Sequence, residues 1–186
     1  MKKIMIDMDD VICEGGFLRL VNQFLHTNYQ KEDIKSYYIQ DIIPVEKQEE
    51  WKEFFANQNV YESCQFLPGA YEAMEKLKEE YELYIATAYI FKENEFYSSF
   101  NLKNKYEWLY QKLPFIKPEQ YVFISNKEIL NCEIKIDDKI SNLKGDAEMK
   151  LLFDSYHNHL ISEEELKKEH IERVCSWQEI EKKLLK

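Results

Sequence analysis

MKKIMIDMDDVIC, residues 1–13, is the stretch on which the interpretation of the whole chain depends. The apolar run from Ile4 to Ile6 predicts a short buried strand. Asp7, Asp9 and Asp10 follow at once, and acidic side chains are rarely buried unless they are paired or bind a metal. Ligands of open α/β sheets bind at the carboxyl ends of the strands. Asp7 and Asp9 are therefore the first candidates for chemistry, although a strand followed by an acidic turn explains the same residues.

The composition limits the classes of partner. The chain has 186 residues, of which 35 are acidic and 25 basic, and its formal net charge is −10. This length fits one domain, or one domain with a modest insertion. Because the excess of acid repels a phosphate backbone, no nucleic acid polymer is expected as a partner. A small anionic substrate would need local positive charge or a metal.

Cysteine spacing and hydropathy bear on the compartment. The four cysteines are scattered and form no CxxC pair, which argues against a zinc site or a disulfide framework. Acids interrupt the apolar run that a signal peptide would need, and no stretch approaches the ~20 apolar residues of a membrane span. We therefore expect a cytoplasmic protein with no membrane partner. A homodimer is compatible with the sequence, which gives no argument for one.

The region after the first strand has helical spacing rather than alternation. Apolar residues recur at helical intervals over 17–25 and 45–57, and nothing over 17–57 resembles a strand. This region is longer than a usual crossover between parallel strands, so we interpret it as a small helical cap. The predicted division is a cap of residues 14–69 inserted into an α/β core of residues 1–13 and 70–186.

Beyond the cap the pattern alternates between helix and strand. Further strands are predicted at 81–88, 120–125, 133–137 and 149–153. Helices are predicted at 70–80 and 103–113, with a loop over 89–101. S-x-x-E capping boxes at Ser162 and Ser176 predict two short C-terminal helices. This order favours a Rossmann-like parallel sheet covered by helices on both faces.

Four of the predicted strands end in polar residues, and parallel strands bring these ends to one edge of the sheet. The residues, in chain order, are Asp7 and Asp9, then Thr87, then Lys127, then Asp137 and Asp138. Carboxylates from two strands suit Mg²⁺, which typically takes one or two carboxylates together with water and phosphate oxygens. A hydroxyl and an ammonium supply donors for phosphoryl oxygens.

These four motifs, in this order, resemble those of the haloacid dehalogenase (HAD) superfamily of phosphotransferases. Within it the chain is most similar to the 5′(3′)-deoxyribonucleotidases. The local similarities are the DMD start, Leu67-Pro68-Gly69-Ala70, Lys105-Tyr106-Glu107-Trp108, Ile136-Asp137-Asp138-Lys139 and His157-Asn158. Asp10 stands where these nucleotidases usually have glycine.

The resemblance implies a Mg²⁺-dependent phosphomonoesterase that acts on nucleoside or deoxyribonucleoside 5′- or 3′-monophosphates. Asp7 would attack phosphorus and form an aspartyl-phosphate. Asp9 would protonate the leaving oxygen and then activate water. The implied metal ligands are Asp7, the Asp9 backbone carbonyl and Asp138, with Asp137 supporting.

The resemblance also implies contacts to phosphate and substrate. Thr87 and Lys127 would hold the phosphoryl group. Lys105, which lies in the segment similar to the nucleotidases, is the second choice for the lysine role, because its helix precedes the third strand whereas Lys127 follows that strand. Candidate contacts for a nucleotide base are the aromatic residues Phe17, Tyr61 and Tyr89. For any one of these aromatics, a place in the cap's own small apolar core is the favoured explanation.

Other functions remain open at this point. The substrate of a HAD phosphatase could be another small ester, such as a sugar phosphate. A receiver-like signalling domain uses similar residues, but its acidic pair lies on the first strand. A non-catalytic phosphate-binding domain is disfavoured because Asp7, Asp9 and Thr87 are all present. For His157, Asn158 and His159 no metal-ligand spacing is found, so a loop-stabilising or solvated role is expected.

Overall fold

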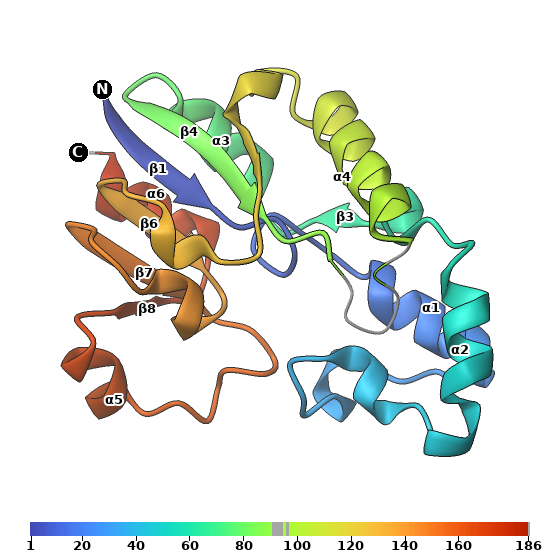
Figure 1. Ribbon diagram of the computed structural model, residues 1–186. Coiled ribbons are helices and arrows are strands. Elements are labelled where there is room, and N and C mark those ends of the chain that lie inside the picture. The colour runs from blue at the N-terminus through green and yellow to red at the C-terminus, as the bar shows by residue number, and fades with distance from the viewer. Residues whose placement is uncertain (91–94, 96, 186) are drawn as a thin grey trace.

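A computed structural model describes residues 1–90, 95 and 97–185 of the chain. Its main feature is a six-stranded sheet with strand order β5-β4-β1-β6-β7-β8, in which every neighbouring pair is parallel (Figure 1). The strands of this sheet are β1 (Lys2–Ile6), β4 (Tyr81–Thr87), β5 (Tyr121–Phe123), β6 (Ile134–Asp137), β7 (Met149–Phe153) and β8 (Glu172–Val174).

Strand β1 lies in the middle of the sheet, which explains its unbroken apolar run. Ile4 pairs with Leu83 of β4 on one side and with Ile134 of β6 on the other, and all three are buried. A strand covered on both faces needs apolar residues at consecutive positions rather than alternation. The register also places the residue after β1 beside the end of β6, because the Asp7 amide donates to the Ile136 carbonyl at 2.9 Å.

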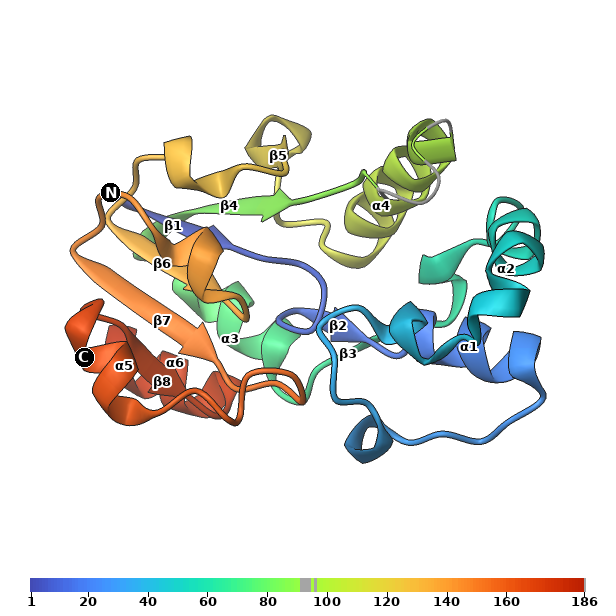
Figure 2. The same cartoon turned by 60° about the horizontal axis from the view of Figure 1, so that its bottom comes forward.

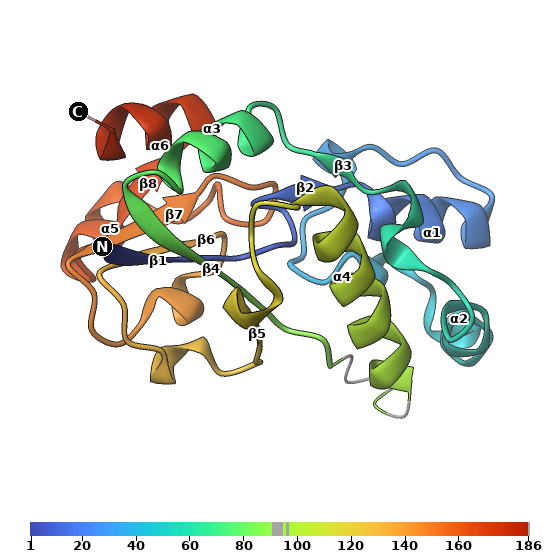
Figure 3. The ribbon, with the colours of Figure 1, turned by 90° about the horizontal axis from the view of Figure 1, so that it is seen from above.

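Helices cover both faces of the sheet. Helices α3 (Ala70–Leu77) and α6 (Trp177–Leu184) lie together on one face, while the 3₁₀ helices η7 (Lys127–Ile129) and η8 (Ile140–Leu143) lie on the other (Figure 3). The remaining core helices are α4 (Ser98–Lys112), α5 (Glu163–Lys168) and η6 (Pro118–Gln120). Among the residues described, no helix is long and apolar enough to cross a bilayer. The predicted fold class, a parallel α/β sheet covered by helices, is confirmed.

Residues 14–69, called the insert below, lie beyond the carboxyl ends of the strands (Figure 2). The insert contains α1 (Gly16–Leu25), α2 (Gln48–Phe55) and the 3₁₀ helices η1 (Lys31–Asp33), η2 (Ile39–Ile42), η3 (Val45–Lys47) and η4 (Val60–Ser63). Phe24 packs against Trp51 and Phe54, with ring centroids 5.4 and 5.5 Å apart. The helical pattern of its sequence is thus explained by a small aromatic core of its own.

A short ribbon marks the junction of the insert with the sheet. Strands β2 (Cys13–Glu14) and β3 (Gln65–Phe66) pair antiparallel, with Cys13 opposite Phe66. The two strands lie on either side of the range 17–57, which was interpreted as free of strands, and neither of them was predicted. The reason is length, since two-residue strands are too short to show alternation.

Other parts of the chain can be compared with the sequence predictions in the same way. Helix α4 begins at Ser98 rather than 103, so the predicted loop is wrong for 98–101, and its positions 91–94 and 96 lie outside the described residues. Strand β8 was not predicted. The two capping boxes are confirmed, because Ser162 accepts from the Glu165 amide and Ser176 from the Glu179 amide.

Candidate active site

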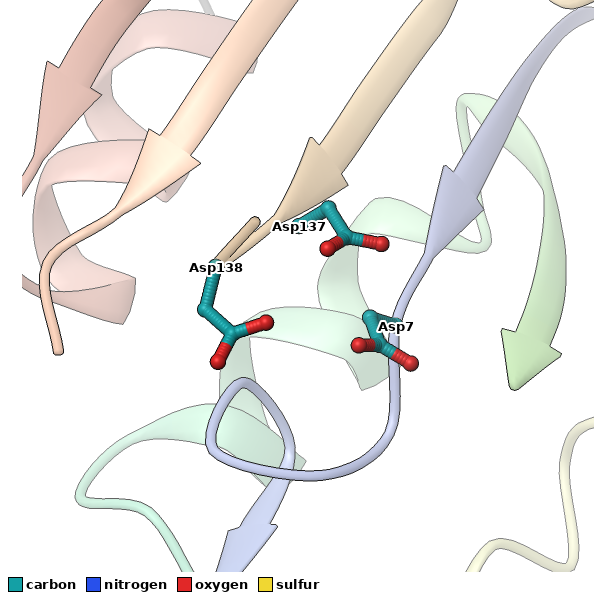
Figure 4. A group of neighbouring side chains, drawn as sticks. All are labelled: Asp7, Asp137 and Asp138. Carbon is teal, nitrogen blue, oxygen red and sulfur yellow. The ribbon is translucent and has the colours of Figure 1, made fainter. Parts of the chain in front are cut away.

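Three buried carboxylates meet where β1 and β6 end. Asp7 follows β1, Asp137 is the last residue of β6 and Asp138 comes next. One ligand oxygen from each lies within 4.8 Å of the others. Figure 4 shows the three side chains turned toward a common space between the two strands. This proximity follows from the position of β1 beside β6 in the sheet.

Lys127 neutralises part of this cluster. Its Nζ lies 2.7 Å from Asp7 Oδ1 and 2.7 Å from Asp137 Oδ2. Burial raises the pKa of Asp7 to about 7, and the Lys127 charge opposes that rise. Burial alone would lower the pKa of Lys127, but the charges of Asp137 and Asp7 raise it, so the ammonium is kept. Lys127 is thus a buried cation between two acids from different strands.

Asp137 and Asp138 differ in how far their oxygens are already bonded. The second oxygen of Asp137, Oδ1, accepts from the Lys139 amide at 3.0 Å and from Asn142 Nδ2 at 2.9 Å. Asp138 Oδ2 lies 2.7 Å from His157 Nε2, whereas its Oδ1 is buried and has no hydrogen-bond partner within the described part of the chain. Burial and the charge of Asp137 raise the pKa of Asp138. Asp138 therefore offers an oxygen that a cation could take.

A second group forms around Asp9, on the side of the site facing the insert. Lys105 Nζ lies 2.5 Å from Asp9 Oδ2 and also donates to Thr87 Oγ1. Tyr61 of the insert donates its hydroxyl hydrogen to Asp9 Oδ1 at 3.0 Å. Lys105 and Thr87 are fully buried, and Asp9 is half-buried. The two lysines that compete in the sequence therefore occupy separate places, Lys127 at Asp7 and Lys105 at Asp9.

The tight loop after Asp7 explains Asp10. Its φ is +56°, in the left-handed region that glycine adopts freely and that aspartate tolerates better than most residues. Lys31 Nζ lies 3.2 Å from Asp10 Oδ1 and also pairs with Glu14. Burial raises the pKa of Asp10 to about 6, and Lys31 opposes the rise. Asp10 thus occupies a backbone position suited to glycine, and a lysine of the insert partly balances its charge.

The comparisons with known proteins agree with this geometry. Residues 1–186 match the family described as 5′ nucleotidase, deoxy (pyrimidine), cytosolic type C protein (NT5C). The chain belongs to this family. It is accordingly a hydrolase that acts on phosphate monoesters, and the receiver-like alternative is set aside.

Relatives of this nucleotidase family cover the chain from end to end. The 5′(3′)-deoxyribonucleotidases of Bacillus subtilis strain 168 and of Bacillus phage SPbeta are each 30% identical to it over 196 residues, with both chains covered completely. The chain is also similar in structure to YfnB of Bacillus subtilis, described as a HAD-type hydrolase and solved with magnesium bound. That match has 12% identity and a TM-score of 0.53, and covers 100% of this chain and 99% of the other.

A second solved structure gives the same fold. A HAD family hydrolase from Deinococcus radiodurans R1, with bound phosphate and sodium, matches at 14% identity and a TM-score of 0.52, covering 97% of this chain and 93% of the other. At such low identity these structural matches establish the HAD fold alone. The predicted resemblance to the HAD superfamily and its deoxyribonucleotidases is thus confirmed.

The candidate base-binding aromatics of this nucleotidase lie in different surroundings. Phe17 stacks on Phe55 of α2 with ring centroids 6.0 Å apart, and both are half-buried. Tyr61 is buried and its ring lies 5.4 Å from Lys105 Nζ, so it borders the polar group around Asp9. Tyr89 is half-buried just after Thr87, and its carbonyl accepts from Asn101 at 2.8 Å. Their role in substrate binding stays a prediction.

Sequence reasoning missed two residues beside the acids. His157 contacts Asp138, and Lys31 contacts Asp10. Their partners lie 19 and 21 residues away, and neither pair has a spacing typical of a motif. Asn158 has the expected loop-stabilising role, because its Nδ2 donates to the Asp138 carbonyl at 2.9 Å and to the Phe153 carbonyl at 2.8 Å.

A surface hollow lies away from these residues, at the amino ends of β1 and β4. Its volume is about 670 Å³, and its lining includes Met1, Tyr81, Tyr84 and Phe115. None of the candidate acids or lysines borders it. Size alone therefore does not mark the site, and the carboxylates at the opposite ends of these strands remain the better candidate.

Proposed function

We propose that this protein is a Mg²⁺-dependent nucleotidase that hydrolyses nucleoside or deoxyribonucleoside monophosphates through an aspartyl-phosphate on Asp7. The observation that carries the proposal is the position of Asp7 between two groups. On one side lie Asp137, Asp138 and Lys127, and on the other lie Asp9, Lys105 and Thr87. A phosphoryl group between them would meet a nucleophile, an acid, two ammonium groups and a hydroxyl.

The donor set fits a divalent metal. Its atoms are carboxylate oxygens, which hard cations such as Mg²⁺ prefer, and the buried Oδ1 of Asp138 has no partner in the described parts of the chain. We assign Asp7, Asp138 and the Asp9 carbonyl as ligands. Asp137 would support them, because both of its oxygens are already bonded. When bound, Mg²⁺ would polarise the phosphoryl group and offset the charge of the gathered acids.

Asp7 is proposed as the nucleophile. Attack by its carboxylate on phosphorus splits one difficult displacement into two easier steps. Lys127, bonded to Asp7 Oδ1, keeps this oxygen oriented and favours the ionised carboxyl against the effect of burial. Replacing either residue should therefore reduce the rate of phosphoryl transfer.

Asp9 is proposed to carry the proton. It would protonate the leaving oxygen in the first step and then, as a carboxylate, take a proton from the attacking water. Lys105 now contacts both Asp9 and Thr87. Phosphoryl oxygens that engage Lys105 would free Asp9 Oδ2 to face the leaving oxygen. Tyr61 keeps the Asp9 side chain oriented through its hydroxyl.

The substrate proposal rests on the relatives and on the insert. The Bacillus subtilis relative is a 5′(3′)-deoxyribonucleotidase and shares the full length of this chain, which supports a nucleotide as substrate. The stacked Phe17 and Phe55 offer aromatic surface that a base could contact. A sugar phosphate remains the alternative within the same reaction class.

The test is a phosphatase panel of 5′- and 3′-nucleotides, 5′- and 3′-deoxynucleotides and sugar phosphates, run with Mg²⁺ and with chelator. We expect hydrolysis of nucleotides that is lost with chelator and restored by Mg²⁺. The Asp7→Asn variant should lose at least about a thousandfold in kcat, since the nucleophile is gone. Asp146→Asn, at an exposed acid outside the site, is the matched control and should keep wild-type activity.

Each arm of the panel has an opposing outcome. Equal activity of wild type and Asp7→Asn would disprove the aspartyl-phosphate mechanism. Hydrolysis confined to sugar phosphates would disprove the nucleotidase proposal and leave a phosphatase. Full activity in chelator would disprove the dependence on Mg²⁺.

A further inference from the structure

The loop after β7 holds Asp138 at two points. Asn158 donates to the backbone carbonyl of Asp138 at 2.9 Å, and His157 Nε2 lies 2.7 Å from its Oδ2. Asn158 is itself fixed, because its Oδ1 accepts from Arg173 Nη1 at 2.9 Å. When Asp138 is ionised, as it must be to bind a metal, it can only accept, so in that state Nε2 of His157 carries the hydrogen in this bond. Asp138 therefore keeps one oxygen bonded to the protein and the other buried without a partner in the described chain.

His157 is packed by the insert. The ring of Tyr37 meets it edge to face, with centroids 4.8 Å apart and planes at 84°. Tyr156 meets it in the same way at 5.1 Å, and the Tyr156 hydroxyl donates to the Tyr37 carbonyl at 3.3 Å. Lys139 Nζ lies 4.0 Å from the centroid of the Tyr37 ring. A residue of the insert is thus held by three residues of the α/β core.

We propose that His157 is a positioning residue that orients Asp138 for a divalent cation, and that Tyr37 makes the affinity for this cation depend on how the insert is docked. The inference rests on the metal assignment in the proposed function. The physical basis is that a carboxylate with one fixed oxygen presents the other in a single direction, whereas a released carboxylate must be ordered when the metal binds.

The coupling must act in both directions. If contact of Tyr37 with His157 raises the affinity for the cation, then the cation stabilises the docked position of the insert by the same free energy. Tyr37 is 38% exposed, so its ring can be removed without opening the core. The contact is therefore a suitable point at which to break the link.

The first test measures cation binding directly, without substrate. Mn²⁺ replaces Mg²⁺ as the probe, and its binding is followed by electron paramagnetic resonance. His157→Leu, which removes the donor, should weaken Mn²⁺ binding about tenfold or more. His157→Gln, which retains an N–H at a similar reach, should restore most of that affinity. His159→Leu is the matched control and should bind as wild type, because His159 contacts Asp154 rather than Asp138.

The second test addresses the insert. Tyr37→Ala, which removes the ring that packs against His157, should weaken Mn²⁺ binding about fivefold. Its control, Tyr110→Ala, removes an exposed tyrosine of α4 and should have no effect. In the His157→Leu background the Tyr37→Ala change should add nothing, because the link runs through His157.

The outcomes separate this inference from the proposed function. If wild type and Asp138→Asn bind Mn²⁺ equally, the metal assignment itself fails. If Asp138→Asn loses Mn²⁺ but folded His157→Leu retains wild-type affinity, only the role of His157 is disproved. A lower melting temperature of His157→Leu with unchanged Mn²⁺ affinity would mean a purely structural histidine. An additive effect of Tyr37→Ala and His157→Leu would disprove the coupling through the ring contact.

Discussion

Asp10 combines an unusual backbone conformation with a partly balanced side-chain charge. Its φ of +56° belongs to a loop in which the Asp10 amide donates to the Cys13 carbonyl at 2.8 Å. Aspartate tolerates this conformation, but its carboxyl adds a negative charge beside Asp9. Lys31 of the insert forms an ion pair with this carboxyl and partly balances its charge. The extra carboxylate is therefore a feature of this chain that the loop accommodates.

The pH dependence of stability should report on Asp10. Its pKa is raised by burial to about 6 in the folded protein, from 3.8, so the folded state binds the proton more tightly than the unfolded state. This group therefore favours folding below pH 4, and its contribution is lost as the pH rises through about 6. Asp10→Asn keeps a side chain that tolerates the left-handed region and removes the titration.

We expect urea unfolding in chelator to show a smaller loss of stability between pH 5 and 7.5 for Asp10→Asn than for wild type, by on the order of 1 kcal/mol. Asp146→Asn, at an exposed acid, serves as the control. Parallel pH profiles for Asp10→Asn and wild type would contradict the expectation.

Replacing Lys127 should lower the stability of the fold as well as the rate of the proposed reaction. Lys127→Met leaves Asp7 and Asp137 buried without their cation, and breaking such a buried pair costs about 3–5 kcal/mol. The loss should be larger at pH 8 than at pH 5.5, because burial raises the pKa of Asp7 to about 7 and protonation of this carboxyl relieves the loss. Urea unfolding at the two pH values measures this. Lys117→Met, at an exposed lysine, is the control, and a loss independent of pH would argue against the charge explanation.

At the scale of the elements, helix α6 supports the loop that carries the acids. Trp177, at its first position, is fully buried and donates from Nε1 to the Val11 carbonyl at 2.7 Å. Trp177→Phe should destabilise the protein by about 1–3 kcal/mol, since the carbonyl loses its donor and a cavity opens.

The matched control for this prediction is Trp108→Phe. Trp108 is also buried, but its Nε1 has no partner among the residues that are described, so its replacement costs packing alone. Urea unfolding of both variants, with kcat measured alongside, separates the two effects. An equal loss for the two variants would mean that the bond to Val11 contributes nothing.

The elements also show what a sequence can and cannot predict. The strand over 149–153 and the end of the strand at Thr87 were predicted in full, because buried runs bounded by polar residues are distinct. Helix α4 starts earlier than predicted because its first turns bury polar residues, Ser98, Asn101 and Asn104, so no apolar period is visible. Strands β2 and β3 have only two residues each, too few for a pattern.

For the site, the sequence predicted the residues at the strand ends, and their assembly follows from parallel topology alone. Contacts between residues far apart in the sequence were not predicted by any hydrophobic periodicity. Tyr61 meets Asp9 from 52 positions away, and Lys105 meets it from 96. Such contacts depend on how the insert and helix α4 pack against the sheet, which local spacing does not encode.

At the scale of the whole molecule, the acids lie where the insert and the sheet meet. Lys31, Tyr37 and Tyr61 reach from the insert to groups at the strand ends. Ligands held in this space should therefore order the insert more than the core. In hydrogen exchange, Mg²⁺ with inorganic phosphate should slow exchange over 31–43 by at least about threefold. Helix α5, remote from the site, is the internal control. Unchanged exchange over 31–43 would contradict this view.

The ion pairs of Lys127 with Asp7 and Asp137 bear on the state of the protein when no ligand is bound. Because an ammonium of the chain already lies between Asp7 and Asp137, the proposed nucleophile has a counter-ion before any ligand binds. The chain can therefore fold with the Asp7 carboxylate already in position and paired. On the proposed mechanism, loss of the metal or release of the product would leave the Asp7 carboxylate with this counter-ion still in place.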